Sequence, residues 1–159
     1  AQIPVWLRPA SGGLVVGILS LWSFGALTFG EGQIFRLVAP GITVAALLAA
    51  LVSKLLASAV CLSTGWRGGF IIPLFFMGAA AGLVLHAALP GVDPTMLMAA
   101  CMVAANVGVT KTPLGSTLVV TEMAGIHLLP TTTLAAVVAM LLTSEVNLIT
   151  SQRTRTTPA

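Results

Sequence analysis

Charged residues are the scarcest component of this 159-residue chain. Aspartate, glutamate, lysine and arginine make up 7% of it and hydrophobic residues 57%, whereas soluble domains carry roughly a quarter charged residues. With a mean hydropathy of +1.06, the composition is that of an integral membrane protein. The formal net charge of +3 comes from so few groups that it gives no support to a nucleic-acid partner, and we expect none.

The residue patterns of enzymes and metalloproteins are also missing. The sequence has no GxxxxGKS/T phosphate loop, no HExxH, no paired Cys/His ligand set and no Ser/His/Asp grouping at an informative spacing. Four acidic residues leave little material for paired-carboxylate catalysis. Cys61 and Cys101 lie in apolar segments, which favours packed thiols over a disulfide or a metal site. We therefore expect no enzymatic activity, no metal and no cofactor.

Apolar segments recur along the chain and are separated by polar or glycine-rich breaks. About 20 helical residues are needed to cross a hydrocarbon core of ~30 Å, and residues 43–62 form the clearest spanning segment. Helices are predicted over residues 12–29, 43–62, 72–89, 94–107, 113–125, 129–143 and 145–155. Because several of them are short or interrupted, the predicted fold is an all-α polytopic membrane bundle of tilted, broken and re-entrant helices.

The most informative stretch is the run STGWRGGFIIP at residues 63–73. A polar, glycine-rich turn that carries Arg67 opens directly into an apolar helix, with Pro73 in its first turn, where the missing N–H of proline is no loss. Glycines let the backbone approach a ligand, while the free N–H groups and the positive end of the helix dipole favour an anion. In a membrane protein, a broken helix of this kind is typical of an ion pathway.

Lys54 lies near the middle of the predicted helix 43–62. A lysine at that depth costs about 2.5 to 3.5 kcal/mol on insertion scales unless it faces protein or water. It could pair with a carbonyl or carboxylate and be structural, or it could add positive potential to an anion pathway. The two interpretations are compatible if the lysine lies near the pore without touching the ion.

Small residues mark the predicted helix 72–89. Gly78 and Gly82 stand four residues apart, with alanines between them. Small residues at this spacing let helices approach closely where lipid removes the usual hydrophobic drive. The pattern predicts tight helix packing and no chemistry.

The order of motifs along the chain resembles that of the CLC chloride channels and proton-coupled chloride transporters. The run GWRGGFIIP at residues 65–73 resembles the family's GxPGGxFxP anion-binding turn. Residues 104–115 and 119–123 resemble its APLT…LVLEMT stretch, and Leu129-Pro130 matches the start of the next family helix. The resemblance covers most of the chain in the correct order.

This resemblance implies that residues 1–159 are the C-terminal half of a CLC membrane domain, the second of two inverted repeats. The first half, with the family's GSGIP and GREGP motifs, has no counterpart here, so we expect a piece of a longer polypeptide. The expected setting is a lipid bilayer, as a multi-pass homodimer in a bacterial-type inner (plasma) membrane. Arg153 and Arg155 follow the last apolar segment, which places the C-terminus in the cytoplasm.

By the same resemblance, the anion is held by the backbone N–H groups of Phe70 and Ile71, with Gly69 and Ile72 completing the turn. Lys54 and Arg67 are expected to add positive potential to the pathway.

Two departures from the family pattern mark a divergent member. The motif phenylalanine is replaced by Ile71, and a phenylalanine stands one position earlier. The family places a tyrosine against the anion on its last helix, but this chain has no tyrosine, and a rough alignment puts Asn147 there. Its amide could donate to an anion as a phenol does. The preferred anion need not be chloride.

The predicted function is therefore transmembrane transport of small inorganic anions, chloride or a related halide, by a channel or a proton-coupled exchanger. Two alternatives stay open. One is a secondary transporter of a small organic anion, which would use the same helix-terminus physics. The other is a non-conducting membrane scaffold whose glycine turn is only a packing break.

Overall fold

The computed structural model describes residues 7–27, 30–66 and 68–146. Within these ranges every regular element is a helix, as the sequence predicts. In chain order the elements are α1 (Arg8–Trp22), the 3₁₀ turn η1 (Phe24–Ala26), α2 (Glu31–Leu37), α3 (Val44–Ser63), α4 (Ile71–Ala88), α5 (Pro94–Thr110), α6 (Pro113–Ala124), the 3₁₀ turn η2 (Ile126–Leu128) and α7 (Leu129–Leu142).

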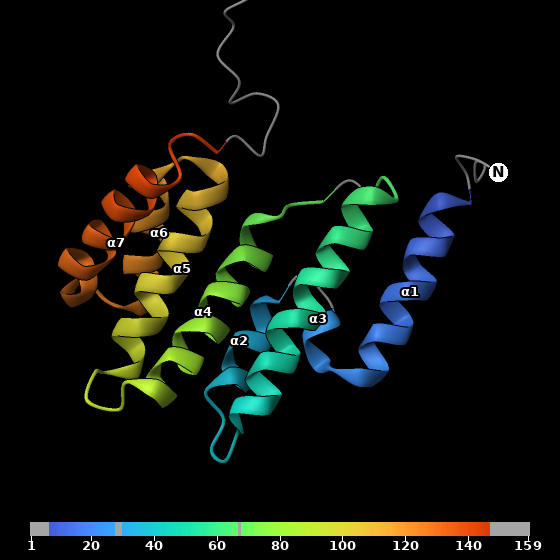
Figure 1. The fold of residues 1–159 in the computed structure, drawn as a ribbon, viewed down its shortest axis with the longest axis horizontal. Helices are drawn as coiled ribbons and strands as arrows, with labels where there is room; N and C mark the ends of the chain where they lie inside the picture. Colours follow the sequence, from blue (N-terminus) through green and yellow to red (C-terminus); the bar gives the residue numbers. More distant parts are fainter. Residues whose placement is uncertain (1–6, 28–29, 67, 147–159) are drawn as a thin grey trace, which may run out of the picture.

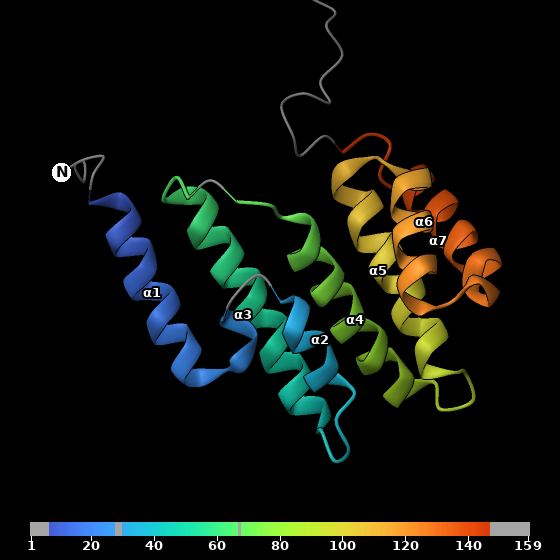
Figure 2. The same cartoon turned by 180° about the vertical axis from the view of Figure 1, so that it is seen from behind.

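The helices follow one another across the molecule in nearly the order of the chain (Figures 1 and 2). Helices α1, α3 and α4 stand side by side, with α2 packed against α4 and η1 against α3. Helices α5, α6 and α7 pack on one another at the far end, and α5 joins them to α4. This arrangement leaves long faces of several helices without a protein neighbour within the described part of the chain.

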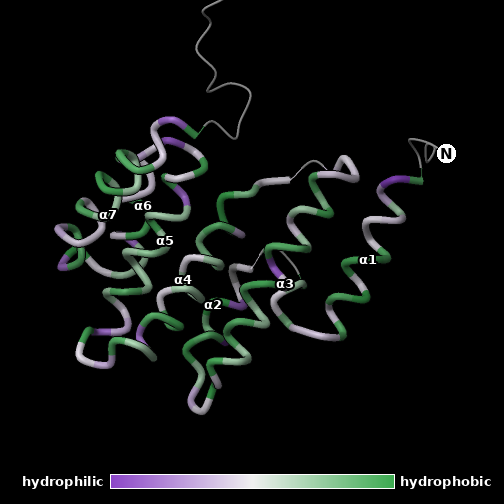
Figure 3. The backbone as a smooth tube through the Cα atoms, in the orientation of Figure 1, coloured by the Kyte–Doolittle hydropathy of each residue, from purple (hydrophilic) through white to green (hydrophobic). Residues whose placement is uncertain are grey.

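These uncovered faces are apolar. Figure 3 shows hydrophobic residues along the helices and hydrophilic ones mainly in the connections and near helix ends. Many strongly exposed large apolar side chains lie on α1, α6 and α7, among them Leu14, Leu21, Leu114, Leu118, Leu134, Leu141 and Leu142. Among the described helices, α3 and α4 are long and apolar enough to cross a membrane, and α5 and residues 126–142 form shorter apolar helices. Such faces suit contact with lipid or with further membrane helices.

The first membrane segment differs from its prediction. Instead of one helix over 12–29, α1 begins earlier, at Arg8, and ends at Trp22, and an extended Ser23 (φ −149°, ψ 136°) leads into η1. The Ser23 side chain accepts a hydrogen bond from the Gly25 N–H, at 3.3 Å. A Cβ added at Gly25 would lie 2.4 Å from the backbone oxygen of Ala50. The apolar run therefore continues as a turn, because its backbone packs directly on α3.

Helices α3 to α7 begin and end close to the predicted positions, except that α5 runs on to Thr110 instead of 107. Thr43 caps α3 by accepting from the Ala46 N–H at 3.2 Å, and Asp93 caps α5 by accepting from the Met96 N–H at 3.0 Å. The predicted helix over 145–155 falls almost wholly outside the described residues.

The contact between α4 and α5 confirms the predicted tight packing. A Cβ added at Gly78 would lie 2.5 Å from Met102 Cα, and one at Gly82 would lie 2.6 Å from the backbone oxygen of Leu97. Both neighbours are backbone atoms, which cannot move aside as a flexible side chain can. Glycine at these two positions is what allows the two helix backbones to approach.

Gly82→Ala is therefore expected to destabilise the protein, because the added methyl group must push α5 away from α4. Overpacking of this kind costs about 1 to 3 kcal/mol. The measurement is the thermal unfolding midpoint of the full-length protein in detergent. Gly91→Ala is the matched control, because a Cβ there meets no atom within 4 Å. Equal midpoints for Gly82→Ala and wild type would contradict this account of the α4–α5 contact.

Candidate functional site

The first turn of α4 leaves backbone donors unused. Helix α4 begins at Ile71 after Phe70, and no side chain caps it. Leu74 N–H donates to Phe70 O at 3.1 Å, whereas Ile71 and Ile72 come too early in the helix to have a carbonyl one turn back. Pro73 has no N–H to satisfy. The start of α4 is thus the positive end of an uncapped helix dipole.

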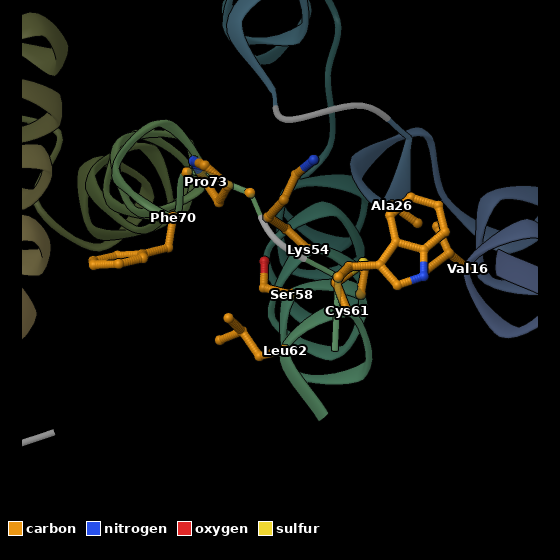
Figure 4. A pocket seen from close by; sticks show the side chains of 12 residues that line it. Val16, Ala26, Lys54, Ser58, Cys61, Leu62, Phe70 and Pro73 are labelled. Atoms are coloured by element: carbon orange, nitrogen blue, oxygen red, sulfur yellow. The ribbon is translucent and has the colours of Figure 1, made fainter. Parts of the chain in front are cut away.

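A cavity of about 340 Å³ lies against this helix start (Figure 4). Its wall combines α1, η1, α3 and the segment that enters α4, elements that are distant in the sequence. The lining residues are Val16, Ala26, Lys54, Ala57, Ser58, Cys61, Leu62, Trp66, Gly68, Gly69, Phe70 and Pro73. The cavity therefore brings the glycine turn next to the one face of α3 that carries Lys54.

Lys54 is held by the protein around it. Its side chain is 1% exposed, and its Nζ donates to Leu27 O at 3.0 Å and lies 5.0 Å from the ring centroid of Phe76. The carbonyl contact and the ring satisfy a charge that would be costly in lipid. Lys54 also lines the cavity, so its position is compatible with both the structural and the electrostatic interpretation.

The turn before α4 is fixed to α1. Trp66 Nε1 donates to Pro9 O at 3.0 Å. A Cβ added at Gly12 would lie 2.4 Å from Thr64 Oγ1, so α1 packs closely on the end of α3. Gly65 has a φ of +83°, which favours glycine and reverses the chain after α3. These contacts hold the end of α3 and Trp66 against α1.

The structure describes five of the seven predicted site residues. Gly69, Phe70 and Lys54 line the cavity. Ile71 and Ile72 form the first turn of α4 and are not among the residues that line the cavity, and the Ile71 side chain is 47% exposed. Arg67 and Asn147 lie outside the described residues.

Sequence reasoning missed Ser58 and Trp66. Ser58 follows Lys54 by four residues, a spacing that puts both on one helix face and could have identified it. Trp66 gave no comparable signal, because its bond to Pro9 joins residues that are 57 positions apart.

A match to a family model identifies the family of this chain. The family model described as "Voltage gated chloride channel" matches residues 1–144. The chain belongs to this CLC family. The resemblance drawn from the order of the motifs is confirmed. Membership also makes the protein an integral membrane protein, in agreement with the apolar faces of its helices.

Individual relatives cover most of this chain. The "Chloride/fluoride channel protein" of Pseudomonas syringae pv. tomato is 28% identical over 152 residues, which are 92% of this chain and 33% of that protein. The "Voltage-gated ClC-type chloride channel ClcB" of Salmonella typhimurium is 35% identical over 156 residues, which cover 87% of this chain and 35% of that protein. The "Chloride channel protein CLC-f" of Arabidopsis thaliana is 31% identical over 140 residues, which cover 76% of this chain and 18% of that protein.

The chain thus spans 33%, 35% and 18% of the lengths of these relatives, about a third or less. No solved structure matches it.

Proposed function

We propose that this chain forms the anion-holding part of a protein that transports small inorganic anions, chloride or a related halide, across a membrane. The observation that carries the proposal is the cavity in which the uncapped start of α4 meets the Lys54 face of α3. Membership of the CLC family supports it independently.

In this mechanism the anion sheds part of its water in the cavity. The N–H groups of Phe70 and Ile71 replace the lost water, and Gly69 and Ile72 complete the turn without placing a side chain between ion and backbone. The fixed dipoles of the helix start make binding of the anion favourable. The anion makes only a few contacts, so it can also leave the site. No covalent chemistry is involved.

Three further residues modulate the site in this proposal. Lys54 adds positive potential from the cavity wall while its Nζ stays on the carbonyl of Leu27. Arg67, within the glycine turn, adds a second positive charge to the approach. Asn147 donates its side-chain amide to the anion where the family uses a tyrosine.

The proposed setting follows from the same membership. Two of the matched relatives are about three times as long as this chain, so the proposed transport unit includes a further segment that corresponds to the rest of their length. We place the unit in a bacterial-type inner membrane as a homodimer. Arg153 and Arg155 put the C-terminal end of the chain on the cytoplasmic side.

Anion efflux from liposomes that contain the full-length protein tests this function. We expect selective efflux among chloride, fluoride and nitrate; fluoride is included because one relative's name joins it to chloride. An imposed proton gradient separates the mechanisms, because it drives chloride through an exchanger and leaves a channel unaffected. If folded protein passes none of these anions, the proposal is wrong.

The size of the cavity is a reason to test the alternative that the protein transports a small organic anion. At about 340 Å³ the cavity falls at the low end of pockets that hold small organic ligands. Acetate and larger carboxylates are therefore added as competitors. Competition by carboxylates but not by halides would favour an organic-anion transporter, and any selective flux would exclude the non-conducting scaffold.

A further inference from the structure

Serine hydroxyls on the helices of this protein usually bond back to their own helix. The hydroxyls of Ser53, Ser63 and Ser116 donate to carbonyls three or four residues earlier, at 3.1, 3.0 and 2.8 Å. Ser11 and Ser20 on α1 do the same, and so does Ser144 in the turn after α7. This bond satisfies the hydroxyl where no water is at hand.

Ser58 differs from all of them. Among the residues that the structure describes, no hydrogen-bond partner is found for its hydroxyl. The side chain is half-buried, and it lines the cavity one turn after Lys54. Figure 4 shows its oxygen on the side of α3 that faces Phe70 and Pro73. An O–H donor is thus available inside the cavity, opposite the start of α4.

The neighbours of Ser58 on this face of α3 offer weaker donors. Lys54 Nζ is held on Leu27 O, and Cys61 carries only a weakly donating S–H. Leu62 has no polar side-chain group. For an ion in the cavity, Ser58 is the side chain of α3 best placed to give a strong hydrogen bond.

We propose that Ser58 donates its hydroxyl to the transported anion and is a specificity-determining residue for small, strongly hydrated halides. This inference rests on the proposed function. The amides at the start of α4 approach the ion from one side, and an O–H from α3 replaces water on the opposite side. A compact ion such as chloride gains more from a short hydrogen bond than nitrate, whose charge is spread over three oxygens.

The test compares Ser58→Val with Ser58→Thr in the full-length protein in liposomes. Valine and threonine have nearly the same shape, so the pair differs in the hydroxyl alone. We expect Ser58→Val to lower the ratio of chloride flux to nitrate flux about tenfold, since a hydrogen bond to a charged group is being lost. Ser58→Thr should keep the wild-type ratio within about twofold.

The readout separates specificity from structure, because a merely packed serine would lower both fluxes together and leave their ratio unchanged. Ser63→Ala is the matched control on the same helix, since its hydroxyl bonds to Val60 O and does not line the cavity. If Ser58→Val does not fold, Ser58→Ala decides the question, because it only removes an atom.

Two outcomes would overturn the proposal in different ways. If wild-type protein passes anions but the hydroxyl-free variants keep its chloride-to-nitrate ratio, Ser58 has no role in specificity and the proposed function stands. If wild-type protein passes no anion, the proposed function fails and this inference fails with it.

Discussion

Gly69→Leu is expected to lower chloride flux by at least about tenfold while the protein stays folded. Gly69 lines the cavity, and a Cβ added there meets no atom within 4 Å. The fold therefore has room for a side chain, but the side chain stands where the ion has to approach the backbone N–H groups. Flux is measured in liposomes, and folding by size-exclusion chromatography and thermal unfolding of the same preparation.

Gly91→Leu is the control for this substitution. It lies in the connection between α4 and α5, and a Cβ there also meets nothing within 4 Å, but Gly91 does not line the cavity. We expect it to leave flux and folding unchanged. A Gly69→Leu protein that conducts chloride at the wild-type rate would show that the ion does not use this turn.

Lys54→Met is expected to weaken chloride binding about tenfold, which corresponds to about 1.4 kcal/mol. Methionine keeps a long apolar stem and a favourable contact with the Phe76 ring, but it removes the positive charge from the cavity wall. It also removes the hydrogen bond to Leu27 O. Binding is measured by isothermal titration of the full-length protein with chloride.

Lys54→Gln separates the two roles of the lysine. Glutamine can still donate to Leu27 O but carries no charge. If charge matters, Lys54→Gln binds chloride as weakly as Lys54→Met, whereas recovery of wild-type affinity would make the lysine a structural tether only. Lys111→Gln is the control, because Lys111 bonds to Gly108 O and Thr143 O at helix ends and does not line the cavity.

Local signals in the sequence predicted the start of α4 well. Glycine and proline act within a few residues of where they stand, so the run from Gly65 to Pro73 is enough to place an uncapped helix start. Gly78 and Gly82 similarly predicted the close approach of α4 to a neighbour, although not that the neighbour is α5. The order of the motifs carried the family assignment, which the family match confirms.

Contacts between distant segments could not be predicted in this way. Ser23 ends α1 because Gly25 packs on the backbone of Ala50, and the uninterrupted apolar run gives no sign of that contact. The partner of Lys54 is a backbone carbonyl 27 residues away, and carbonyls have no sequence signature. The cavity is formed by residues of α1, η1, α3 and the start of α4. Only the start of α4 could be predicted from the sequence, because the other elements reach the cavity through contacts between distant segments.

The most direct test of the proposed anion site is the position of bromide in crystals of the full-length protein, located by its anomalous scattering. Bromide is a halide close to chloride in size and charge. We predict a bromide peak in the cavity, within hydrogen-bonding distance of the Phe70 or Ile71 N–H and of the Ser58 hydroxyl. A conducting protein whose bromide sites all lie elsewhere, with none in this cavity, would contradict the account.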